Sequence, residues 1–414
     1  MLEGQPRLAL AVSGGGDSLA LMWLARQWLD GLGKPPEVHV LTVDHGLHEK
    51  SAEVAARTCR QAGALGFACT VLRWEGKKPR TCIEERARQA RYELMGAWCA
   101  ENGAALVTAH TMDDQAETLL MRLARGSGLE GLAAMRPVAR APCARGAVML
   151  FRPLLRVRRA RLRATLKAAG LEWHEDPANE DERFERVRLR KLMPLLEEAG
   201  LSARAIGLSA RRLGRANAAM CQYAHTFLRA HARLHDLGWA EASLPAFREL
   251  PAEVGIRALA WLLGHVGGQG ERLRDLGGVE EVHDWVASSQ GRARTLGGAR
   301  LGRRARTLVI TREPGRIREV TEVPKGAREA VWDERFIMAF EDLRADVRIM
   351  ALNDLRVEDM PARERHVPAD AWKAQPAIVH GDRLAGLPAL GWRAQGAPFA
   401  RARARLLFRL PEEP

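Results

Sequence analysis

The segment that most constrains the fold is a hexapeptide of serine, glycine and aspartate near the start of the chain. Residues 13–18 read Ser-Gly-Gly-Gly-Asp-Ser and directly follow the apolar run 8–12. A strand that ends in a glycine turn and opens a helix brings backbone N–H groups and the positive end of a helix dipole to one point. The hexapeptide therefore predicts a phosphate site, to which Ser13 and Ser18 add hydroxyl donors.

Two common phosphate loops do not match this hexapeptide. No Gly-Lys-Ser/Thr follows it, which excludes a Walker A loop, and Leu19 stands where the dinucleotide fingerprint needs its third glycine. The hexapeptide resembles the PP-loop, SGGxDS, of the ATP-pyrophosphatases, which cleave ATP to AMP and pyrophosphate. An ordinary glycine turn is the alternative. The resemblance implies an ATP-binding loop made of Ser13, Gly14, Gly15, Gly16, Asp17 and Ser18.

Strand and helix patterns alternate over the first 150 residues. This order predicts right-handed βαβ units and a doubly wound, Rossmann-like parallel sheet, with ligands beyond the carboxyl ends of the strands. The expected strands are 7–12, 37–43, 66–72, 104–109 and 147–152. The expected helices are 17–30, 49–63, 82–101 and 112–125.

Residues suited to chemistry follow the second expected strand. Asp44 and His45 stand at its end. Asp44 could orient an amine or a hydroxyl group, and His45 could bond a base or a phosphate. Asp44 could instead cap the next helix.

Carboxylates follow the fourth expected strand, after His110. Thr111 and Asp114 resemble a capping box. Asp113 and Glu117 are four residues apart, so we expect both on one helix face as neighbours. Carboxylates beside a phosphate loop usually hold Mg²⁺ or a cationic substrate.

Two arginines on the third expected helix are candidate phosphate ligands. Arg88 and Arg91 are three residues apart and share a helix face. Guanidinium groups match phosphate geometry. A solvated charged face is the alternative.

The chain is strongly basic, with a formal net charge of +13. This excess of bases over acids favours a polyanionic partner, and nucleic acid first. Genome base composition would explain the preference for Arg over Lys, but not the excess. Residues 152–167 contain basic residues and no acid, as expected for phosphate contacts, although a solvated face is again the alternative.

The six cysteines include no C-x-x-C pair, so we expect neither a cysteine metal site nor a disulfide framework. We also find no signal peptide and no apolar run of membrane-span length, and expect a cytoplasmic protein with no membrane partner.

Changes in composition predict three domains. Residues 1–200 form the catalytic domain that the PP-loop resemblance implies, and residues 201–297 form a helical domain. Residues 298–414 form a small mixed α/β domain, with short strands at 307–310, 335–340 and 406–409.

Further motifs narrow the resemblance to the tRNA(Ile)-lysidine synthetases, a branch of the PP-loop family. It is specific over residues 7–200 and becomes general afterwards. One position departs from the family pattern. The family usually places an asparagine directly after the arginine of its last motif, and Val187 stands there, after Arg186. The motifs that carry the resemblance are 44–45, 88–92, 110–118, 125–131, 152–155, 173–179 and 183–190.

The resemblance implies a ligase that joins L-lysine to C2 of the wobble cytidine in the isoleucine tRNA with a CAU anticodon. ATP first adenylates the cytidine, and AMP and pyrophosphate are released. ATP and Mg²⁺ are the implied cofactors, Asp17 is a candidate metal ligand beside ATP oxygens and water, and a homodimer is expected. The implied catalytic residues are Asp44, Arg88, Asp113, Asp114 and Glu117. His45 and His110 join the PP-loop in binding ATP. The implied tRNA-binding residues are Arg91, Arg122, Arg152, Arg159, Arg163, Arg183, Arg186 and Arg190. The resemblance also implies that the helical domain 201–297 contacts tRNA and that the domain 298–414 recognises it.

Other functions remain alternatives at this point. A 2-thiocytidine synthetase would need cysteine pairs, and amide-forming relatives would usually bring a glutaminase domain or another ammonia source. A tRNA-binding protein that keeps the fold without its activity would bind tRNA but not turn ATP over to AMP.

Overall fold

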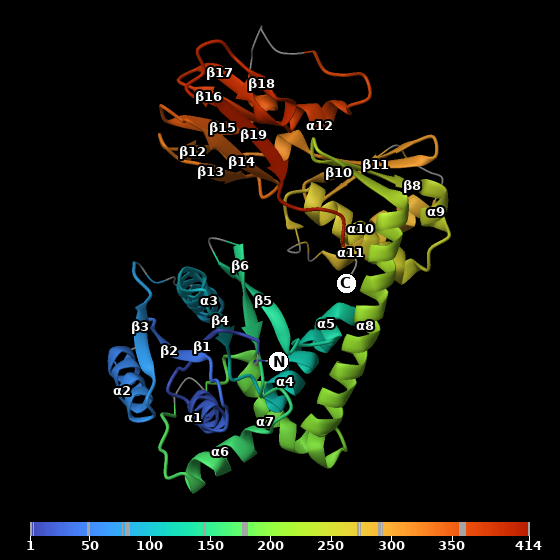
Figure 1. The fold of residues 1–414 in the computed structure, drawn as a ribbon. Helices are drawn as coiled ribbons and strands as arrows, with labels where there is room; N and C mark the ends of the chain where they lie inside the picture. Colours follow the sequence, from blue (N-terminus) through green and yellow to red (C-terminus); the bar gives the residue numbers. More distant parts are fainter. Residues whose placement is uncertain are drawn as a thin grey trace. The chain divides into compact units, whose positions relative to one another are not determined.

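The computed structural model describes residues 2, 4–47, 50–76, 78, 83–143, 146–175, 181–270, 273, 275–288, 291, 293–355 and 362–412. The chain forms two compact units, Met1–Asn217 and Ala218–Pro414 (Figure 1). The domain limits expected at 200 and 297 stay predictions.

The first unit contains the expected parallel sheet. Its order is β3-β2-β1-β4-β6-β5, and all neighbours pair in parallel except β5 and β6. Five strands confirm the sequence pattern, whereas β5 was not expected. The strands are β1 (Arg7–Ala11), β2 (Glu37–Asp44), β3 (Ala68–Arg73), β4 (Ala105–Val107), β5 (Val138–Cys143) and β6 (Gly146–Phe151).

Helices cover both faces of this sheet. Leu8 and Leu10 pack on one face with residues of α1 (Gly16–Asp30) and α6 (Arg159–Ala168). Ala9 packs on the other face with residues of α3 (Ile83–Asn102). Alternate residues of a strand point to opposite faces, so apolar residues on both sides fix β1 in the centre of the sheet.

The order of the strands defines where a ligand belongs. The chain passes outward from β1 to β2 and β3, crosses back, and adds β4 on the other side of β1. The carboxyl ends of β1 and β4 therefore border the crevice of a doubly wound sheet. The PP-loop follows β1, and α4 (Met112–Ala124) follows β4.

Three helices extend the first unit beyond the sheet. Ala116 of α4 packs with Ala203 and Ile206 of α8 (Ala203–His231), and Met193 of α7 (Glu185–Glu198) joins them. The short helix α5 (Leu129–Leu132) follows α4 in the chain.

The stretch 201–297, expected to be helical, also contains strands. A hairpin of β7 (Ala232–His235) and β8 (Trp239–Ser243) interrupts it. The turn contains Gly238 at φ +77°, a conformation that costs glycine little and other residues more. The hairpin joins a five-stranded sheet in the order β7-β8-β11-β10-β9. Its other strands are β9 (Ala293–Leu296), β10 (Ala299–Arg304) and β11 (Thr307–Arg312), and the neighbouring helices are α9 (Leu244–Arg248), α10 (Ala252–Val266) and α11 (Leu276–Ala287).

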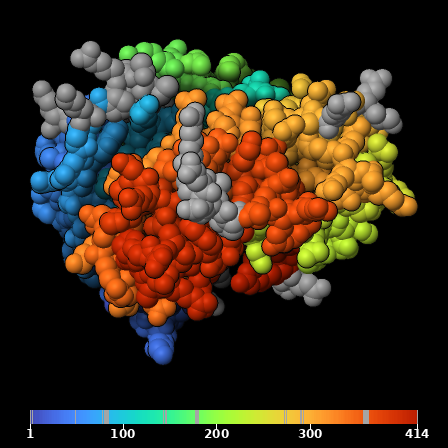
Figure 2. All heavy atoms as spheres, turned by 90° about the horizontal axis from the view of Figure 1, so that it is seen from above, coloured from blue at the N-terminus to red at the C-terminus, as the bar shows by residue number. Residues whose placement is uncertain are grey.

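Two antiparallel sheets follow in the second unit. Their orders are β12-β15-β16-β17-β18 and β13-β14-β19, and Ile349 of the first packs in one core with Phe336 and Met338 of the second. Atoms of both sheets lie side by side in orange and red in Figure 2. The strands are β12 (Thr321–Val323), β13 (Glu329–Trp332), β14 (Phe336–Glu341), β15 (Val347–Ala351), β16 (Pro376–His380), β17 (Arg383–Leu387), β18 (Trp392–Arg393) and β19 (Arg401–Leu406), with α12 (Ala369–Lys373) before β16.

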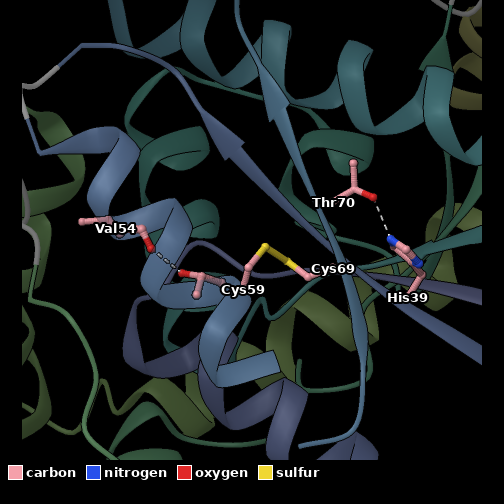
Figure 3. Close-up of a disulfide and its surroundings, with 6 residues drawn as sticks. His39, Val54, Cys59, Cys69 and Thr70 are labelled. Atoms are coloured by element: carbon pink, nitrogen blue, oxygen red, sulfur yellow. Dashed lines mark hydrogen bonds between the residues drawn. A yellow bond between two sulfur atoms is a disulfide. The ribbon is translucent and has the colours of Figure 1, made fainter. Parts of the chain in front are cut away.

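One expectation about the cysteines needs correction. Cys59 of α2 (Ser51–Ala64) and Cys69 of β3 form a disulfide (Figure 3). Ten positions separate them in the sequence, and their Cα atoms lie 5.4 Å apart. Sequence spacing did not indicate this pair, because the packing of α2 on β3 brings the two side chains together.

None of the described helices is both long and apolar enough to cross a membrane.

Candidate active site

A cavity of about 570 Å³ lies at the carboxyl ends of β1, β2 and β4. Segments that are distant in the sequence reach it: the PP-loop, the end of β2, helix α3, the end of β4 with the start of α4, and the chain from α6 to α7. The predicted site residues that line it are Ser13, Gly15, Gly16, Asp17, Ser18, His45, Arg88, Arg91, His110, Asp114, Arg159, Arg163, Arg186 and Arg190.

The PP-loop turns sharply after β1. Gly14 has φ +85°, and a Cβ atom there would lie 2.9 Å from Oγ1 of Thr58. Only glycine meets both conditions without strain. The hydroxyl of Ser18 accepts a hydrogen bond from the backbone N–H of Ser13 and donates one to the carbonyl of Gly15. These two hydrogen bonds stabilise the turn of the loop.

The two helices that begin at the cavity have different N-termini. Thr111 and Asp114 form a capping box on α4, in which each side chain bonds the other's backbone N–H. This confirms the capping part of the sequence interpretation. Gly15 precedes α1, and no side chain caps that helix. The first N–H groups of α1 are thus the ones suited to an anionic ligand.

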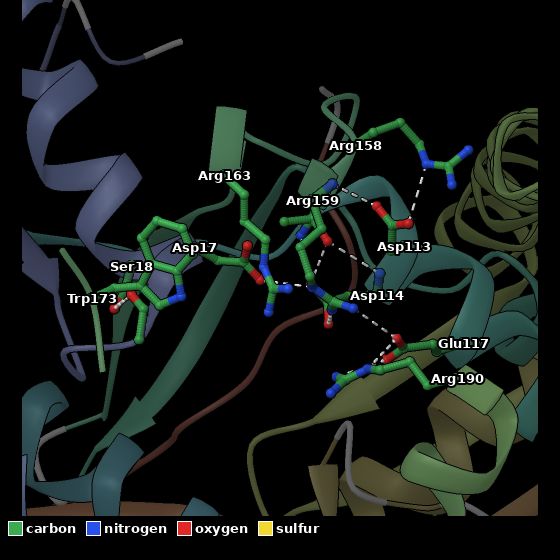
Figure 4. Close-up of polar contacts among 12 residues, drawn as sticks. Asp17, Ser18, Asp113, Asp114, Glu117, Arg158, Arg159, Arg163, Trp173 and Arg190 are labelled. Atoms are coloured by element: carbon green, nitrogen blue, oxygen red, sulfur yellow. Dashed lines mark hydrogen bonds and ion pairs between the residues drawn. The ribbon is translucent and has the colours of Figure 1, made fainter. Parts of the chain in front are cut away.

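Arg159 lies at the centre of the acidic residues (Figure 4). Its Nε is 2.9 Å from Oδ2 of Asp17, its Nη2 is 3.0 Å from Oδ1 of Asp114, and its Nη1 is 3.3 Å from Oε1 of Glu117. Its backbone N–H donates to Asp113 over 2.7 Å. A residue that sequence analysis assigned to tRNA therefore contacts all four carboxylates.

Asp113 and Glu117 do not face each other across an open site. Oδ1 of Asp113 accepts from Nε of Arg158 at 3.1 Å. Glu117, with a side chain only 1% exposed, pairs with Arg190 at 2.8 Å and Arg186 at 3.5 Å besides Arg159. Neither carboxylate lines the cavity, which Asp114 reaches instead.

Burial and the nearby Arg159 act differently on Asp17 and Asp114, which both line the cavity. Burial raises the pKa of Asp17 and outweighs the opposing effect of Arg159. Burial also acts to raise the pKa of Asp114, but Arg159 and two hydrogen bonds from Thr111 bring the net pKa below its ordinary value. Oδ1 of Asp17 is buried and has no hydrogen-bond partner. A cation or donor from a ligand would satisfy it.

His110 is uncharged near neutral pH. Burial, the largest cause, lowers its pKa to about 3. Arg152, Arg88 and Arg91 act in the same direction, whereas Asp114 opposes them. Nδ1 of His110 lies 2.9 Å from the hydroxyl of Thr108. The ring can therefore bind a ligand as a neutral donor or acceptor.

Asp44 holds the turn after β2 and does not itself line the cavity, although His45 does. Its Oδ1 accepts hydrogen bonds from the Ser51 hydroxyl at 2.5 Å and from the Gly46 N–H at 3.1 Å. The bond from Ser51 lowers the pKa of Asp44. Asp44 is thus an ionised group next to the site.

The arginines of α3 lie over an aromatic ring on the cavity wall. The guanidinium carbons of Arg88 and Arg91 lie 5.4 and 6.0 Å from the centre of the Tyr92 ring. Both arginines line the cavity, but Arg88 is also exposed to solvent, so its role as a phosphate ligand stays a prediction.

Three residues assigned to tRNA lie away from the cavity lining. Arg122 donates to the carbonyl oxygens of Gly131 and Ala134, and Arg152 donates to that of Arg136. The exposed Arg183 pairs with Asp181 at 2.6 Å. Their roles in binding tRNA stay predictions.

Comparison with known proteins agrees with this geometry. The PP-loop domain family matches residues 2–196. The tRNA(Ile)-lysidine synthase of Bradyrhizobium diazoefficiens is 45% identical over 288 residues, covering 68% of this chain and 78% of that protein. The tRNA(Ile)-lysidine synthase of Ruegeria pomeroyi is 37% identical over 396 residues, covering 94% of this chain and 91% of that protein.

The chain belongs to the tRNA(Ile)-lysidine synthase family. The family member from Rhodopseudomonas palustris is 44% identical over 336 residues, covering 76% of this chain and 94% of that protein. Among solved structures, the U34-tRNA thiolase NcsA from Methanococcus maripaludis matches with a TM-score of 0.43 and 16% identity, over 50% of this chain and 72% of that chain. Membership in a PP-loop family implies that the chain uses ATP.

Sequence reasoning missed part of the cavity lining, to which Trp173 and His174 belong. Two residues pack against the PP-loop. The ring of Trp173 lies 3.3 Å from the position that a Cβ atom at Gly16 would take, and the N–H of His174 donates to the carbonyl of Gly14 at 3.0 Å. Both residues stand in the motif 173–179, which was used only for recognition. Residues 176–179 of that motif lie outside the described residues. Over the described part of the chain, no three His, Cys, Asp or Glu side chains gather as a metal site.

Proposed function

We propose that this chain ligates L-lysine to C2 of the wobble cytidine in the isoleucine tRNA with a CAU anticodon, at the expense of ATP. The observation that carries the proposal is the single cavity shared by the PP-loop, the neutral His110 and arginines of α3, α6 and α7. A nucleoside triphosphate needs an anion cradle, cations and neutral polar groups, and this cavity offers all three.

The first step would join cytidine to AMP. The cytidine O2 attacks the α-phosphorus of ATP, the bond to the β-phosphate oxygen breaks, and pyrophosphate leaves. The uncapped start of α1 and the hydroxyl of Ser13 are suited to hold that pyrophosphate. Arg88 and Arg91 are suited to balance the charge that develops on the phosphate.

The residues also fit a magnesium ion. Oδ1 of Asp17 is a buried carboxylate oxygen without a hydrogen-bond partner at the edge of the PP-loop, and Mg²⁺ prefers such oxygen ligands together with phosphate and water. Bound there, Mg²⁺ would lower the negative charge of the phosphates. Asp17 is the residue that would hold it.

The second step would transfer lysine. The neutral ε-amine attacks C2 of the adenylated cytidine, the C2–O2 bond breaks, AMP leaves with that oxygen, and the attacking nitrogen passes a proton to a general base. Asp44 has a lowered pKa and stays ionised, which suits recognition of the lysine ammonium before attack. Asp113, Asp114 and Glu117 would act through the arginines to which they are bonded.

Binding of tRNA would use basic residues around the cavity mouth. Arg163 is about half exposed and lies 6.0 Å from the ring centre of Trp173. Contacts to phosphates give affinity and salt dependence more than sequence choice. The expected homodimer is part of this proposal and is tested by sedimentation equilibrium.

The deciding experiment is incorporation of radiolabelled lysine into purified isoleucine tRNA with a CAU anticodon. Reactions run with and without ATP, and the methionine tRNA with the same anticodon is the control. We expect ATP-dependent labelling of the isoleucine tRNA alone.

Other outcomes would contradict the proposal in different ways. Release of AMP and pyrophosphate without labelling would keep the PP-loop chemistry but assign another acceptor or nucleophile. Binding of tRNA with neither AMP nor labelling would favour a protein that only binds tRNA.

A further inference from the structure

The carboxylates bound by Arg159 come from two different helices. Asp17 stands in the first turn of α1, whereas Asp114 and Glu117 stand in the first two turns of α4. Each of the three guanidinium nitrogens bonds a different carboxylate, and Figure 4 shows Arg159 between them. One side chain therefore ties together the helix starts that border the β1–β4 crevice.

The three carboxylates differ in what their remaining oxygens contact. The second oxygen of Asp114 accepts from the N–H and the hydroxyl of Thr111, at 2.8 and 2.7 Å. Both oxygens of Glu117 are bonded by Arg190, at 2.8 and 3.4 Å. Oδ1 of Asp17 is buried with no hydrogen-bond partner, and Asp17 lines the cavity. Of these three groups, Asp17 alone keeps an oxygen for a ligand.

We propose that Arg159 is a positioning residue for the nucleotide: it fixes Oδ2 of Asp17 so that Oδ1 is presented to the cation and phosphates of magnesium–ATP. The inference rests on the proposed function for its ligand, and it assigns Arg159 to the nucleotide rather than to tRNA.

The chemistry of arginine suits this role. A planar guanidinium presents several donors in fixed directions and can bond three acids at once, whereas a lysine ammonium is a compact point charge. The acids also repel one another, and removal of their shared cation would leave Asp17 free to rotate away from the cavity. Outer groups that orient a metal ligand typically change metal affinity when they are removed.

Two other roles for Arg159 predict different behaviour. A tRNA contact requires a guanidinium that reaches solvent, but this side chain is only 16% exposed and its three nitrogens are bonded to protein. A clamp that merely stabilises the fold would change the melting temperature without a specific effect on nucleotide affinity.

The test is a double-mutant cycle between Arg159 and Asp17, with magnesium–ATP as the probe. R159M, R159K, D17N and the doubles R159M/D17N and R159K/D17N are compared with R161M. Arg161 is an exposed arginine on the same helix, so R161M is a matched control. Isothermal titration calorimetry without tRNA gives the Kd at several Mg²⁺ concentrations, and thermal unfolding without nucleotide gives stability.

We expect R159M to weaken magnesium–ATP binding by about 10-fold to 100-fold, in the range seen for groups that orient metal ligands. R159K lies between R159M and the wild type, R161M matches the wild type, and adding R159M to D17N causes little further loss, because the two residues act as one unit. If R159M does not fold, R159K and D17N complete the same cycle.

Two results would overturn the inference: nucleotide affinity in both Arg159 variants equal to that of the wild type, or losses from R159 variants and D17N that multiply independently. Failure of the proposed function is a separate outcome. In that case the wild type incorporates no lysine into tRNA, whether or not the cycle on magnesium–ATP affinity behaves as expected.

Discussion

Nε of Arg159 lies 2.9 Å from Oδ2 of Asp17, although the two residues are 142 positions apart in the chain. The contact joins the PP-loop, which the sequence marks clearly, to a basic stretch whose role the sequence leaves open. It places an arginine among carboxylates in the lining of the cavity at the PP-loop.

The conformation of Gly14 makes the PP-loop sensitive to a single methyl group. G14A places a Cβ atom on a residue at φ +85° and 2.9 Å from Oγ1 of Thr58. We expect a stability loss of about 1–3 kcal/mol from the strained backbone, together with weaker ATP binding. Urea unfolding and ATP titration measure the two effects. G33A, where a Cβ atom has open space, should change neither. Equal ATP affinity in G14A and the wild type would contradict this account of the loop.

Removal of the Glu117 charge should destabilise the first unit. E117Q leaves Arg159, Arg186 and Arg190 without the carboxylate that they share. Breaking a buried ion pair by removing one partner costs about 3–5 kcal/mol. Chemical unfolding measures the loss.

The matched control for E117Q is E182Q. Glu182 pairs only with Lys191 among its described salt bridges, and both side chains are more than half exposed. We expect no measurable change there, because solvent screens an exposed ion pair. Similar losses in the two variants would show that burial of Glu117 does not matter.

His110 should make stability fall in acid. Its pKa is about 3 in the folded chain against 6.5 for an ordinary histidine, so between these values the unfolded chain binds a proton that the folded chain does not. The free energy of unfolding therefore decreases as pH falls from 6.5 towards 3, by up to about 1.4 kcal/mol per pH unit from this residue. H110Q should flatten the slope, and H366Q, at an exposed histidine, should not. An unchanged slope in H110Q would contradict the burial of the ring.

The disulfide between Cys59 and Cys69 should be detectable and stabilising. Without reductant, alkylation of the denatured protein followed by peptide mapping should find these two cysteines unmodified. Since the loop is short, C59S or C69S should cost about 2–3 kcal/mol of stability under oxidising conditions. The difference should disappear when the wild type is reduced. Full alkylation of both cysteines without reductant would exclude the bond.

The salt dependence of tRNA binding should separate Arg163 from Arg159. Arg163 is about half exposed, and its described salt bridge is to the exposed Glu175 at 3.4 Å. R163A should weaken tRNA binding and reduce the salt slope by about one. R159K, which keeps the charge within the acidic cluster, should leave that slope unchanged. An unchanged slope in R163A would assign this residue to a solvated face.

Local patterns were enough to predict much of the catalytic unit. The sequence pattern located β1, β2, β3, β4 and β6 to within about two residues, because each is a short run rich in apolar residues. The antiparallel β5 was missed: its sequence, with Arg140 and Pro142, lacks an apolar run. The hairpin at 232–243 was missed because helical periodicity on either side concealed a short turn.

Many of the predicted site residues line one cavity, but several have other partners than the sequence suggested. The sequence brought Asp17, His45, His110, Asp114 and the α3 arginines to one place, since carboxyl ends of parallel strands share an edge. The sequence also predicted that Asp113 and Glu117 are neighbours, because an argument from helical spacing takes account of one helix alone. Arginines from α6 and α7 bind those acids instead.

By itself, the sequence determined the parallel sheet, the glycine loop and the capped start of α4, because each depends on residues close together in the chain. Only the tertiary structure decided which acids form ion pairs with arginines, that His110 is uncharged, and which cysteines form a disulfide. These properties depend on burial and on partners up to 142 residues away, and short-range patterns contain no information about either.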